Sequence, residues 1–374
     1  MHVVSIVVLF LWVLAFVRTI LNLLLLPRLS ADAQPASEPF VSVVVPARNE
    51  SHIIEDTVRA FLAQDYPHLE LIVVNDRSTD GTAEILGRIA DAHLTVIDGE
   101  EPPPGWLGKP WALEQGSRRA RGELILFADA DIIYAPAAVR AAVAELLRSD
   151  SALVALFPYF EMHTFGEHIG MPMLPFVFAM VPLWLANRWQ RPGLAIGGGA
   201  GNFVRRESLE AIGYFTNLRD AVVDDIGLAQ LVRQHGGRTH GVRAEHLVHV
   251  RMYHGTRAIV EGFTKNLFPA IGRSYVIATP LFALLIACHL LPYGLAVSGD
   301  RYAIATVILI SATRALLFGA MGYSILNAIF LHPLMIGMWA YIFLRSVWIT
   351  GVRKQVRWRG RVYDATQTRF GADR

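Results

Sequence analysis

GELILFADADII, residues Gly122 to Ile133, joins a continuously apolar run to a pair of carboxylates. The run from Leu124 to Ala128 contains no polar residue, which is typical of a strand buried on both faces of a parallel sheet. The run is followed by Asp129 and Asp131, and open α/β sheets bind their ligands at the carboxyl ends of such strands. The stretch therefore predicts a site where two acids hold a divalent cation against a diphosphate.

A simpler alternative is that Asp129 caps the following turn and Asp131 is solvated. Acidic residues are common after strands, so Asp-x-Asp is a weak motif when it stands alone. Its interpretation depends on the segments around it.

The residues on both sides of this stretch alternate between strand and helix patterns. Apolar and β-branched runs predict strands, and apolar residues at helical spacing predict the helices that join them. The expected strands are 41–46, 69–75, 94–97 and 124–128; a helix is expected at 50–64, and Asp80 is expected to cap a further helix. This alternation predicts an α/β fold with a mostly parallel sheet and helices on both faces.

The composition indicates a membrane protein. The chain has 374 residues, of which 53% are hydrophobic, and a mean hydropathy of +0.38, which is too apolar for a purely soluble protein. Residues 1–27 predict a transmembrane anchor, and 28–39 predict a flexible linker. A cleaved signal peptide is the alternative to the anchor, but the apolar run is too long and lacks a basic start.

Charge and cysteine content exclude other classes. The formal net charge of +2 and the position of the densest basic run in the tail argue against a nucleic-acid partner. The single cysteine, Cys288, excludes an intrachain disulfide bond.

The C-terminal part is again apolar. We expect a juxtamembrane amphipathic helix at 256–275, about three transmembrane segments within 276–348, near 276–297, 302–322 and 328–348, and a basic cytoplasmic tail at 349–374. Three spans after a cytoplasmic domain would put that tail outside, so one stretch is expected to be re-entrant or the number of spans differs by one. Arg314 lies inside the second span and should face a partner, a polar cavity or a head group, or snorkel.

Five segments together resemble the inverting family-2 glycosyltransferases of the GT-A fold. In chain order they are VSVVVPARNES, VVNDRSTDGT, GKPWALEQG, FADADI and VVDDIGLAQLVRQHG, and they span about residues 41–250. The ordered set is far more specific than any one member. The resemblance implies a GT-A domain, expected at 40–255, with a Rossmann-like sheet that binds a nucleotide-sugar donor.

The resemblance also implies which residues bind the donor. Asp76 is expected to contact the uracil of a UDP-sugar on the sheet edge that carries Pro46, Arg48 and Glu50, although Asn75 and Asp76 also suit an ordinary turn. Lys109, on a loop after residues 102–108, is expected to neutralise the diphosphate; a solvated loop lysine is the alternative.

The glycine-rich stretch 196–202 (IGGGAGN) is expected to lie against the donor sugar. Gly198 and Gly199 would let the sugar approach the backbone closely, and a plain loop is the alternative.

The chemistry implied by the resemblance rests on four aspartates. Asp129 and Asp131 become the ligands of Mg²⁺ or Mn²⁺, Asp131 being the stronger, and the cation stabilises the departing nucleoside diphosphate. Asp225 is expected to act as general base with Asp224 in support, although acids in a first helical turn also favour the helix dipole.

The downstream sequence indicates the kind of acceptor. The Gln-x-x-Arg-Trp motif of polymer-making relatives is missing from the sequence downstream of the expected base, and residues 251–253 (RMY) and 261–265 (EGFTK) resemble the diaponeurosporenoate (carotenoid) glycosyltransferase branch. Residues 171–186 are apolar but broken by three prolines, so we expect an interfacial segment at 165–190 that presents a lipid acceptor to Asp225.

The sequence thus predicts an integral protein of the cell (inner) membrane with a cytoplasmic catalytic domain. It would move one sugar from a nucleotide donor to a lipid-soluble acceptor. A polyprenyl-phosphate or polysaccharide-pathway transferase is the alternative activity, and a non-catalytic nucleotide-sugar-binding membrane protein is the alternative class. The sequence indicates neither the sugar nor the oligomeric state.

Overall fold

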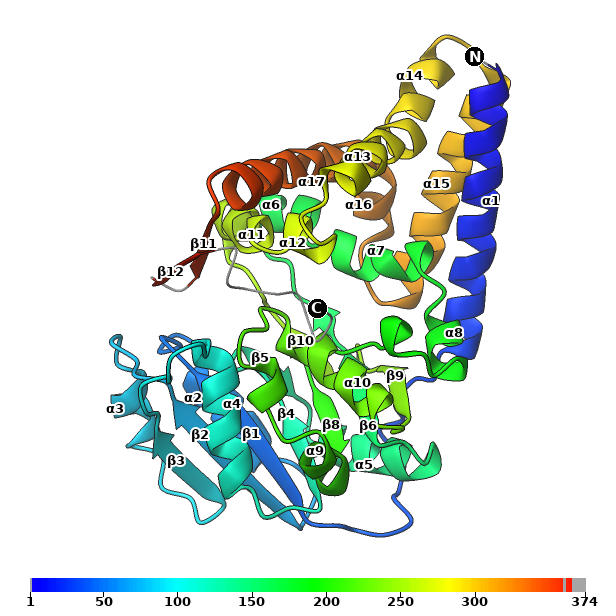
Figure 1. Ribbon diagram of the computed structural model, residues 1–374. Coiled ribbons are helices and arrows are strands. Elements are labelled where there is room, and N and C mark those ends of the chain that lie inside the picture. The colour runs from blue at the N-terminus through cyan, green and yellow to red at the C-terminus, as the bar shows by residue number, and fades with distance from the viewer. Residues whose placement is uncertain (1, 359–360, 365–374) are drawn as a thin grey trace. The chain divides into compact units, whose positions relative to one another are not determined.

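The computed structural model describes residues 2–358 and 361–364. Contacts divide the chain into two compact units. The sheet unit comprises Pro27–Glu161 and Leu185–Met252, and the helical unit comprises the residues up to Leu26, residues 162–184 and the described chain from Tyr253 onward. Each unit is therefore assembled from segments that are distant in the sequence (Figure 1).

The sheet unit contains a seven-stranded sheet in the order β3-β2-β1-β4-β8-β6-β9. All neighbouring pairs are parallel except those that involve β8, which is antiparallel to both β4 and β6. The strands are β1 (Val41–Ala47), β2 (Leu69–Asn75), β3 (Leu94–Asp98), β4 (Leu124–Phe127), β6 (Leu153–Phe157), β8 (Asn202–Arg205) and β9 (Thr239–Arg243). The predicted mostly parallel sheet is confirmed.

Helices cover both faces of this sheet, as the continuous apolar strands require. One face packs against α2 (Ile54–Leu62) and α5 (Ala138–Arg148), and the other against α4 (Gly108–Arg119), α9 (Arg206–Ala211) and α10 (Asp224–Gln234). The unit also contains α3 (Thr82–Leu86), the 3-10 turns η1 (Pro192–Leu194) and η2 (Thr216–Leu218), and a small sheet of β5 (Ile132–Tyr134), β7 (Tyr159–Phe160) and β10 (Val248–Val250).

Three local predictions need correction. The helix expected at 50–64 is shorter, Ile54–Leu62, because the residues before it form turns that bind the loop after β2. The cap of α3 is Gly81, with φ 93°, rather than Asp80, whose carboxylate instead accepts a hydrogen bond from the Thr82 N–H. Lys109 lies in the first turn of α4 and not on a loop.

The helical unit holds four helical stretches that are long and apolar enough to cross a membrane. They are His2–Leu25, Tyr275–Val297, Arg301–Ala320 and His332–Val352 among the described residues. The first is α1 (His2–Leu25); the others are built from α13 (Tyr275–His289) with α14 (Leu291–Val297), from α15 (Arg301–Ala320), and from α17 (His332–Ser346) with the π-helical turn η3 (Val347–Val352). The last begins at His332, not near 328, because α16 (Ile325–Phe330) ends before it.

The segments that were expected beside the membrane form short helices. Residues 165–190 contain α6 (Phe165–Gly170), α7 (Met173–Met180) and α8 (Leu183–Arg188), separated near Pro172 and Pro182. Residues 256–275 form α11 (Gly255–Thr264) and α12 (Leu267–Ala270) rather than one amphipathic helix. The tail predicted at 349–374 starts too early, because residues 349–352 belong to η3 and so to the last apolar stretch. The chain then forms β11 (Gln355–Trp358) and β12 (Arg361–Asp364), and residues 359–360 and 365–374 lie outside the described residues.

Candidate active site

The candidate site begins where the parallel strands end. Strands β1 and β2 pair in register up to Ala47 and Asn75, and β1 also pairs with β4 up to Phe127. Because these strands are parallel, the residues that follow them emerge at one edge of the sheet. Asp76 and Asp129 therefore lie at the same edge, as the sequence predicts.

An ion pair joins the ends of β1 and β2. The Arg48 Nη1 donates a hydrogen bond of 2.7 Å to the Asp76 carbonyl and lies 3.4 Å from the Asp76 Oδ2. The Asp76 N–H in turn donates to the Ala47 carbonyl. Asp76 is only 5% exposed, so the chain holds this carboxylate in a fixed place beside Arg48.

Side chains also fasten the two following loops to each other. The Thr79 N–H donates to Asn49 Oδ1, the Ser51 N–H donates to Asp80 Oδ2, and the buried Glu50 donates its N–H to Thr82 Oγ1. Burial raises the pKa of Asp80, but hydrogen bonds from Thr82 and Ser51 outweigh it and lower the value to about 2. These bonds give the edge a rigid lining.

Lys109 lies between the acid that follows β4 and the acid pair that begins α10. Its ammonium lies 2.6 Å from Asp129 Oδ1 and 3.4 Å from Asp224 Oδ1. The side chains of Lys109 and Asp129 are each about one third exposed, whereas Asp224 is nearly buried. Asp225 is close enough to interact electrostatically with Lys109, so one cation faces three carboxylates.

This crowding changes the acidity of the groups. Burial is the largest influence on Asp224 and raises its pKa to about 6, against the opposing effect of Lys109 and with the help of the charges on Asp225 and Asp129. Burial likewise raises the pKa of Asp225. Burial alone would lower the pKa of Lys109, but the three carboxylates hold it above its usual range.

The glycine-rich stretch 196–202 forms hydrogen bonds to both Asp129 and Asp225. The Gly199 carbonyl accepts a hydrogen bond from the Asp129 N–H, and the Gly199 N–H bonds to the Asp225 carboxylate. A Cβ at Gly199 would lie 2.6 Å from Asp129 Oδ2, and one at Gly197 would collide with the Asp225 carbonyl. Only glycine lets this backbone lie against both aspartates.

Asn202 and Tyr134 support that stretch, and the sequence reasoning missed both. The Asn202 Oδ1 accepts from the Gly198 N–H at 3.2 Å, and its Nδ2 donates to the Asp225 carbonyl at 3.0 Å. The Tyr134 hydroxyl donates to the Ala200 carbonyl. Asn202 directly follows the glycines, which is a usable signal, whereas nothing in the sequence near Tyr134 points to this role.

Asp129, Asp224 and Asp225 line one cavity with about 260 Å³ of empty space. Lys109, Gly198, Gly199 and Asn202 also line it, with Leu113, Phe127, Ala128, Phe215 and Leu228 as its apolar wall. Asp76, Arg48, Pro46 and Glu50 are placed at the same sheet edge but do not line this cavity, and neither does Asp131. The structure thus brings the predicted base and one predicted metal ligand together.

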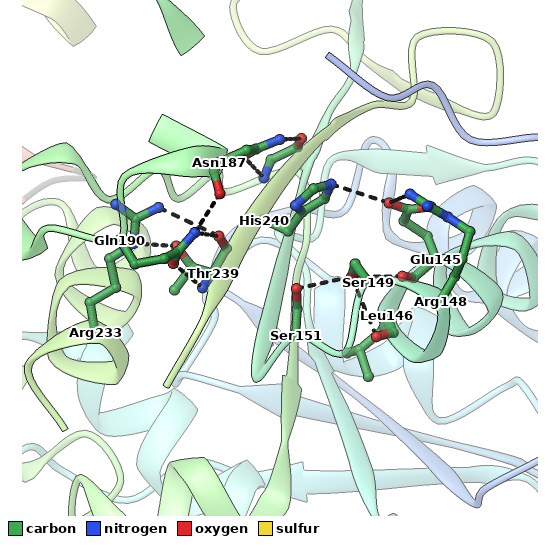
Figure 2. A network of polar contacts seen from close by, with 11 residues as sticks. Glu145, Leu146, Arg148, Ser149, Ser151, Asn187, Gln190, Arg233, Thr239 and His240 are labelled. Carbon is green, nitrogen blue, oxygen red and sulfur yellow. Dashed lines mark hydrogen bonds and ion pairs between the residues drawn. The ribbon is translucent and has the colours of Figure 1, made fainter. Parts of the chain in front are cut away.

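A polar network fixes the far half of α10, as Figure 2 shows. The buried Arg233 guanidinium donates to the Thr239 hydroxyl and to the carbonyls of Ala186 and Arg191. Gln190 exchanges hydrogen bonds with the Thr239 backbone in the same view. Burial lowers the pKa of Arg233 to about 10, so it stays charged, and it fastens α10 to the segment that precedes the glycines.

The acids at the end of β4 suit a hard divalent cation. Oxygen ligands are those that Mg²⁺ and Mn²⁺ prefer, and the three carboxylates that face Lys109 leave an excess of negative charge. No group of three or more metal-ligating side chains occurs among the described residues. This arrangement fits a cation such as Mg²⁺ that takes one or two carboxylates and completes its shell with phosphate and water.

Comparison with known proteins identifies the domain. Residues 42–213 match the family model Glycosyl transferase family 2. The chain carries a domain of this family. The match contains Asp76, Lys109, Asp129 and the glycine-rich stretch, and it ends before Asp224 and Asp225.

Two curated relatives are similar to this chain over a longer stretch than that domain. A 4,4′-diaponeurosporenoate glycosyltransferase of Staphylococcus haemolyticus is 24% identical over 63% of this chain and 62% of its own length. A beta-monoglucosyldiacylglycerol synthase of Trichormus variabilis is 28% identical over 54% of this chain and 43% of its own length. The chain therefore spans less than two thirds of each of these relatives.

A solved structure shares the fold over nearly the whole chain. It is a mannosyltransferase from Pyrobaculum calidifontis in complex with GDP-Man and Mn²⁺, and it superimposes with a TM-score of 0.59 at 23% identity. The match covers 94% of this chain and 99% of that one. This likeness establishes the GT-A fold of the sheet unit and confirms the predicted fold class.

Proposed function

We propose that this protein is an inverting glycosyltransferase. It would move a single sugar from a nucleotide-sugar donor, a UDP-sugar in our interpretation, to a lipid-soluble acceptor at the membrane. The observation that carries the proposal is the cavity in which Lys109, Asp129, Asp224 and Asp225 meet at the carboxyl edge of a family-2 domain. A scaffold protein that only binds nucleotide-sugar has no need of a buried acid pair opposite the cation.

The donor would lie along the sheet edge. Asp76 would accept a hydrogen bond from the uracil ring of the donor, and Arg48 would hold the Asp76 carboxylate in place. Pro46 and Glu50 would form part of the same nucleotide pocket. Lys109 would donate to the diphosphate, and Gly198 and Gly199 would lie against the sugar. When bound, Mg²⁺ or Mn²⁺ would be held by Asp129 and Asp131 and would neutralise charge on the diphosphate.

Asp225 would take the proton of the acceptor. As the acceptor hydroxyl oxygen forms its bond to the anomeric carbon, the bond from that carbon to the diphosphate oxygen breaks on the opposite side. The hydroxyl proton passes to the Asp225 carboxylate, and the nucleoside diphosphate leaves with the bonding electrons. The raised pKa of Asp225 makes it a stronger base than an exposed aspartate, and Asp224 shares the local charge.

The apolar helices and the names of the relatives support a lipid acceptor and a membrane location. Four helical stretches are apolar enough to cross a membrane, and the two curated relatives carry names that describe transfer to a carotenoid acid and synthesis of a glucosyl lipid. Nucleotide sugars are made in the cytosol, so we infer an inner-membrane protein whose sheet unit faces the cytoplasm. Presentation of the lipid by residues 165–190 stays a prediction.

The test is turnover of nucleotide-sugars by the purified full-length protein with membrane lipids. We expect metal-dependent release of nucleoside diphosphate and a glycolipid product of inverted configuration, visible by mass spectrometry and NMR. Comparing the turnover of UDP-sugars with that of GDP-mannose tests whether the donor carries uracil, as we expect. Asp131→Ala should lose the activity, and Asp225→Ala should lose it while still binding UDP; unchanged turnover in both variants would refute the assigned roles.

A further inference from the structure

The helical unit buries the Arg314 guanidinium without a carboxylate among its described contacts. Arg314, in the middle of α15, is only 1% exposed, and an arginine keeps its charge at physiological pH. The four helical stretches that are apolar enough to cross a membrane contain no Asp or Glu at all. An ionisable residue in such surroundings is expensive to bury, so its retention requires a partner.

The protein partners of Arg314 do not balance its charge. Its Nε donates to the Ala328 carbonyl, its Nη1 lies 3.3 Å from the Met335 sulfur, and its guanidinium lies over the rings of Phe176 and Phe318. None of these groups carries a negative charge. A thioether sulfur is a weak acceptor on a flexible side chain, so it can give way to a better one.

Two further polar groups in the same cluster lack partners. The buried His332 has an Nδ1, and Tyr293 has a hydroxyl, that find no hydrogen-bond partner in the described structure. Their rings stack with centroids 6.1 Å apart, and His332 also bonds to His289 at 3.3 Å. Buried polar groups without partners are rare in folded proteins and call for an explanation.

A separate, mostly apolar hollow lies nearer the start of α1 and α15. Its lining includes Val8 of α1 and Thr306 of α15. Val8 precedes the buried Trp12 by one helical turn, and Thr306 precedes Arg314 by two turns through the buried Ile310. Trp12 in turn lies edge-on against the rings of His289 and His332. The hollow and the Arg314 cluster thus follow one another along α1 and α15, with Trp12 and Ile310 between them.

We propose that the helical unit binds a lipid-soluble molecule that ends in an oxyanion, either a carboxylate or a phosphate. The oxyanion would accept hydrogen bonds from Arg314, the Tyr293 hydroxyl and His332, taking the place of the Met335 sulfur. Its alkyl or isoprenoid chain would run along the apolar residues of α1 and α15 towards Val8 and Thr306. A purely structural Arg314, which only holds the Ala328 carbonyl, would leave the two orphan groups and the uncompensated charge unexplained.

The test is thermal unfolding of the full-length protein in a non-ionic detergent, with no sugar donor present. The probes are oleate, oleyl phosphate, uncharged oleyl alcohol and inorganic phosphate alone. We expect a saturable rise in Tm with oleate, oleyl phosphate or both, and none with oleyl alcohol or inorganic phosphate. A response to only one charged probe identifies the head group. Equal shifts with oleate and oleyl alcohol, or no shift with either charged probe, would overturn the proposal.

Variants locate the site. Arg314→Met should weaken binding of the effective probe by about tenfold or more, the range for loss of a hydrogen bond to a charged group. Tyr293→Phe removes a single oxygen and should weaken binding severalfold, which keeps the test decisive if Arg314→Met does not fold. Arg18→Met, which removes another arginine of an apolar helix, is the matched control and should bind as wild type does. Wild-type affinity in both Arg314→Met and Tyr293→Phe would contradict the assignment. The outcome is independent of transferase activity, because binding alone is measured.

Discussion

Lys109 in the sheet unit and Arg314 in the helical unit are cations in opposite surroundings. Lys109 faces Asp129, Asp224 and Asp225, so its neighbourhood carries an excess of negative charge. Arg314 is surrounded by a carbonyl, a thioether and aromatic rings, so its neighbourhood carries an excess of positive charge. The first suits a divalent cation and the second an oxyanion. The sign of the uncompensated charge therefore indicates the ligand more directly than the presence of a basic residue does.

The largest effect should follow from Asp225→Asn, which tests whether the acids around Lys109 are catalytic. The substitution keeps the shape of the side chain but removes the proton acceptor, so kcat should fall by about 10²–10⁴-fold, the usual contribution of general base catalysis. Binding of UDP, measured by calorimetry, should be preserved. A wild-type kcat in this variant would show that the acid pair only stabilises the start of α10 and is not catalytic.

The next largest effect should come from Lys109→Met. Loss of the ammonium removes a donor to the developing charge of the diphosphate, and kcat/KM should fall by about 10²–10³-fold, as when one such donor is removed from other enzymes. Arg118→Met, on the same helix and paired with Glu114, is the matched control and should keep wild-type kcat/KM. Equal losses in the two variants would mean that the charge of α4, not the position of Lys109, matters.

Met335→Glu would place a carboxylate beside Arg314, as Lys109 has carboxylates beside it in the sheet unit. The new carboxylate would lie beside the Arg314 guanidinium and compete with the bound oxyanion, so binding of oleate or oleyl phosphate should weaken by about tenfold or more. Met335→Gln has the same size without the charge and should keep most of the affinity. If the two variants bind the charged lipid equally well, the lack of a negative charge beside Arg314 does not determine binding of the ligand.

The acids beside Lys109 should also set the pH dependence of turnover. A base works only when ionised, and burial raises the pKa of Asp224 to about 6 and raises that of Asp225. Turnover should therefore fall with decreasing pH at a higher pH than it would for an exposed aspartate base, because the pKa of Asp225 is raised. Asp224→Asn should move this limb to lower pH because a neighbouring negative charge is removed. A limb near pH 4, the usual value for an exposed aspartate, would contradict a buried base.

The smallest effect should come from a charge pair that is not buried. Arg59 and Glu55 form an exposed ion pair on α2, and Arg59→Ala should change the free energy of unfolding by only about 0.3 kcal/mol. Chemical denaturation measures this change. A large loss of stability here would show that surface pairs matter in this chain, which would weaken the emphasis on Lys109 and Arg314.

Local sequence patterns predicted much of the sheet unit. The strand at Leu69–Asn75 has the bounds expected from its apolar run, and the helix that carries Asp225 begins at the acid pair as expected. These features follow from periodicity and from acids in a first helical turn, which are properties of neighbouring residues.

What the sequence did not reveal depends on contacts between distant residues. Asn202 bonds to Asp225, and Arg233 bonds to Ala186, across separations that no local pattern encodes. Lys109 was expected on a loop because glycine and proline precede it, yet α4 begins directly after them. The sequence marks Arg314 as unusual, but the lack of a counter-ion depends on neighbours such as Met335 that come from other helices.

Manganese binding measured by electron paramagnetic resonance tests the central claim most directly, namely that excess negative charge beside Lys109 serves a metal-assisted transfer. We predict that wild-type protein with UDP binds one Mn²⁺, that Asp129→Asn and Asp131→Asn bind it far more weakly, and that Arg118→Met retains it. Equal Mn²⁺ affinity in wild type and in both aspartate variants would contradict the account.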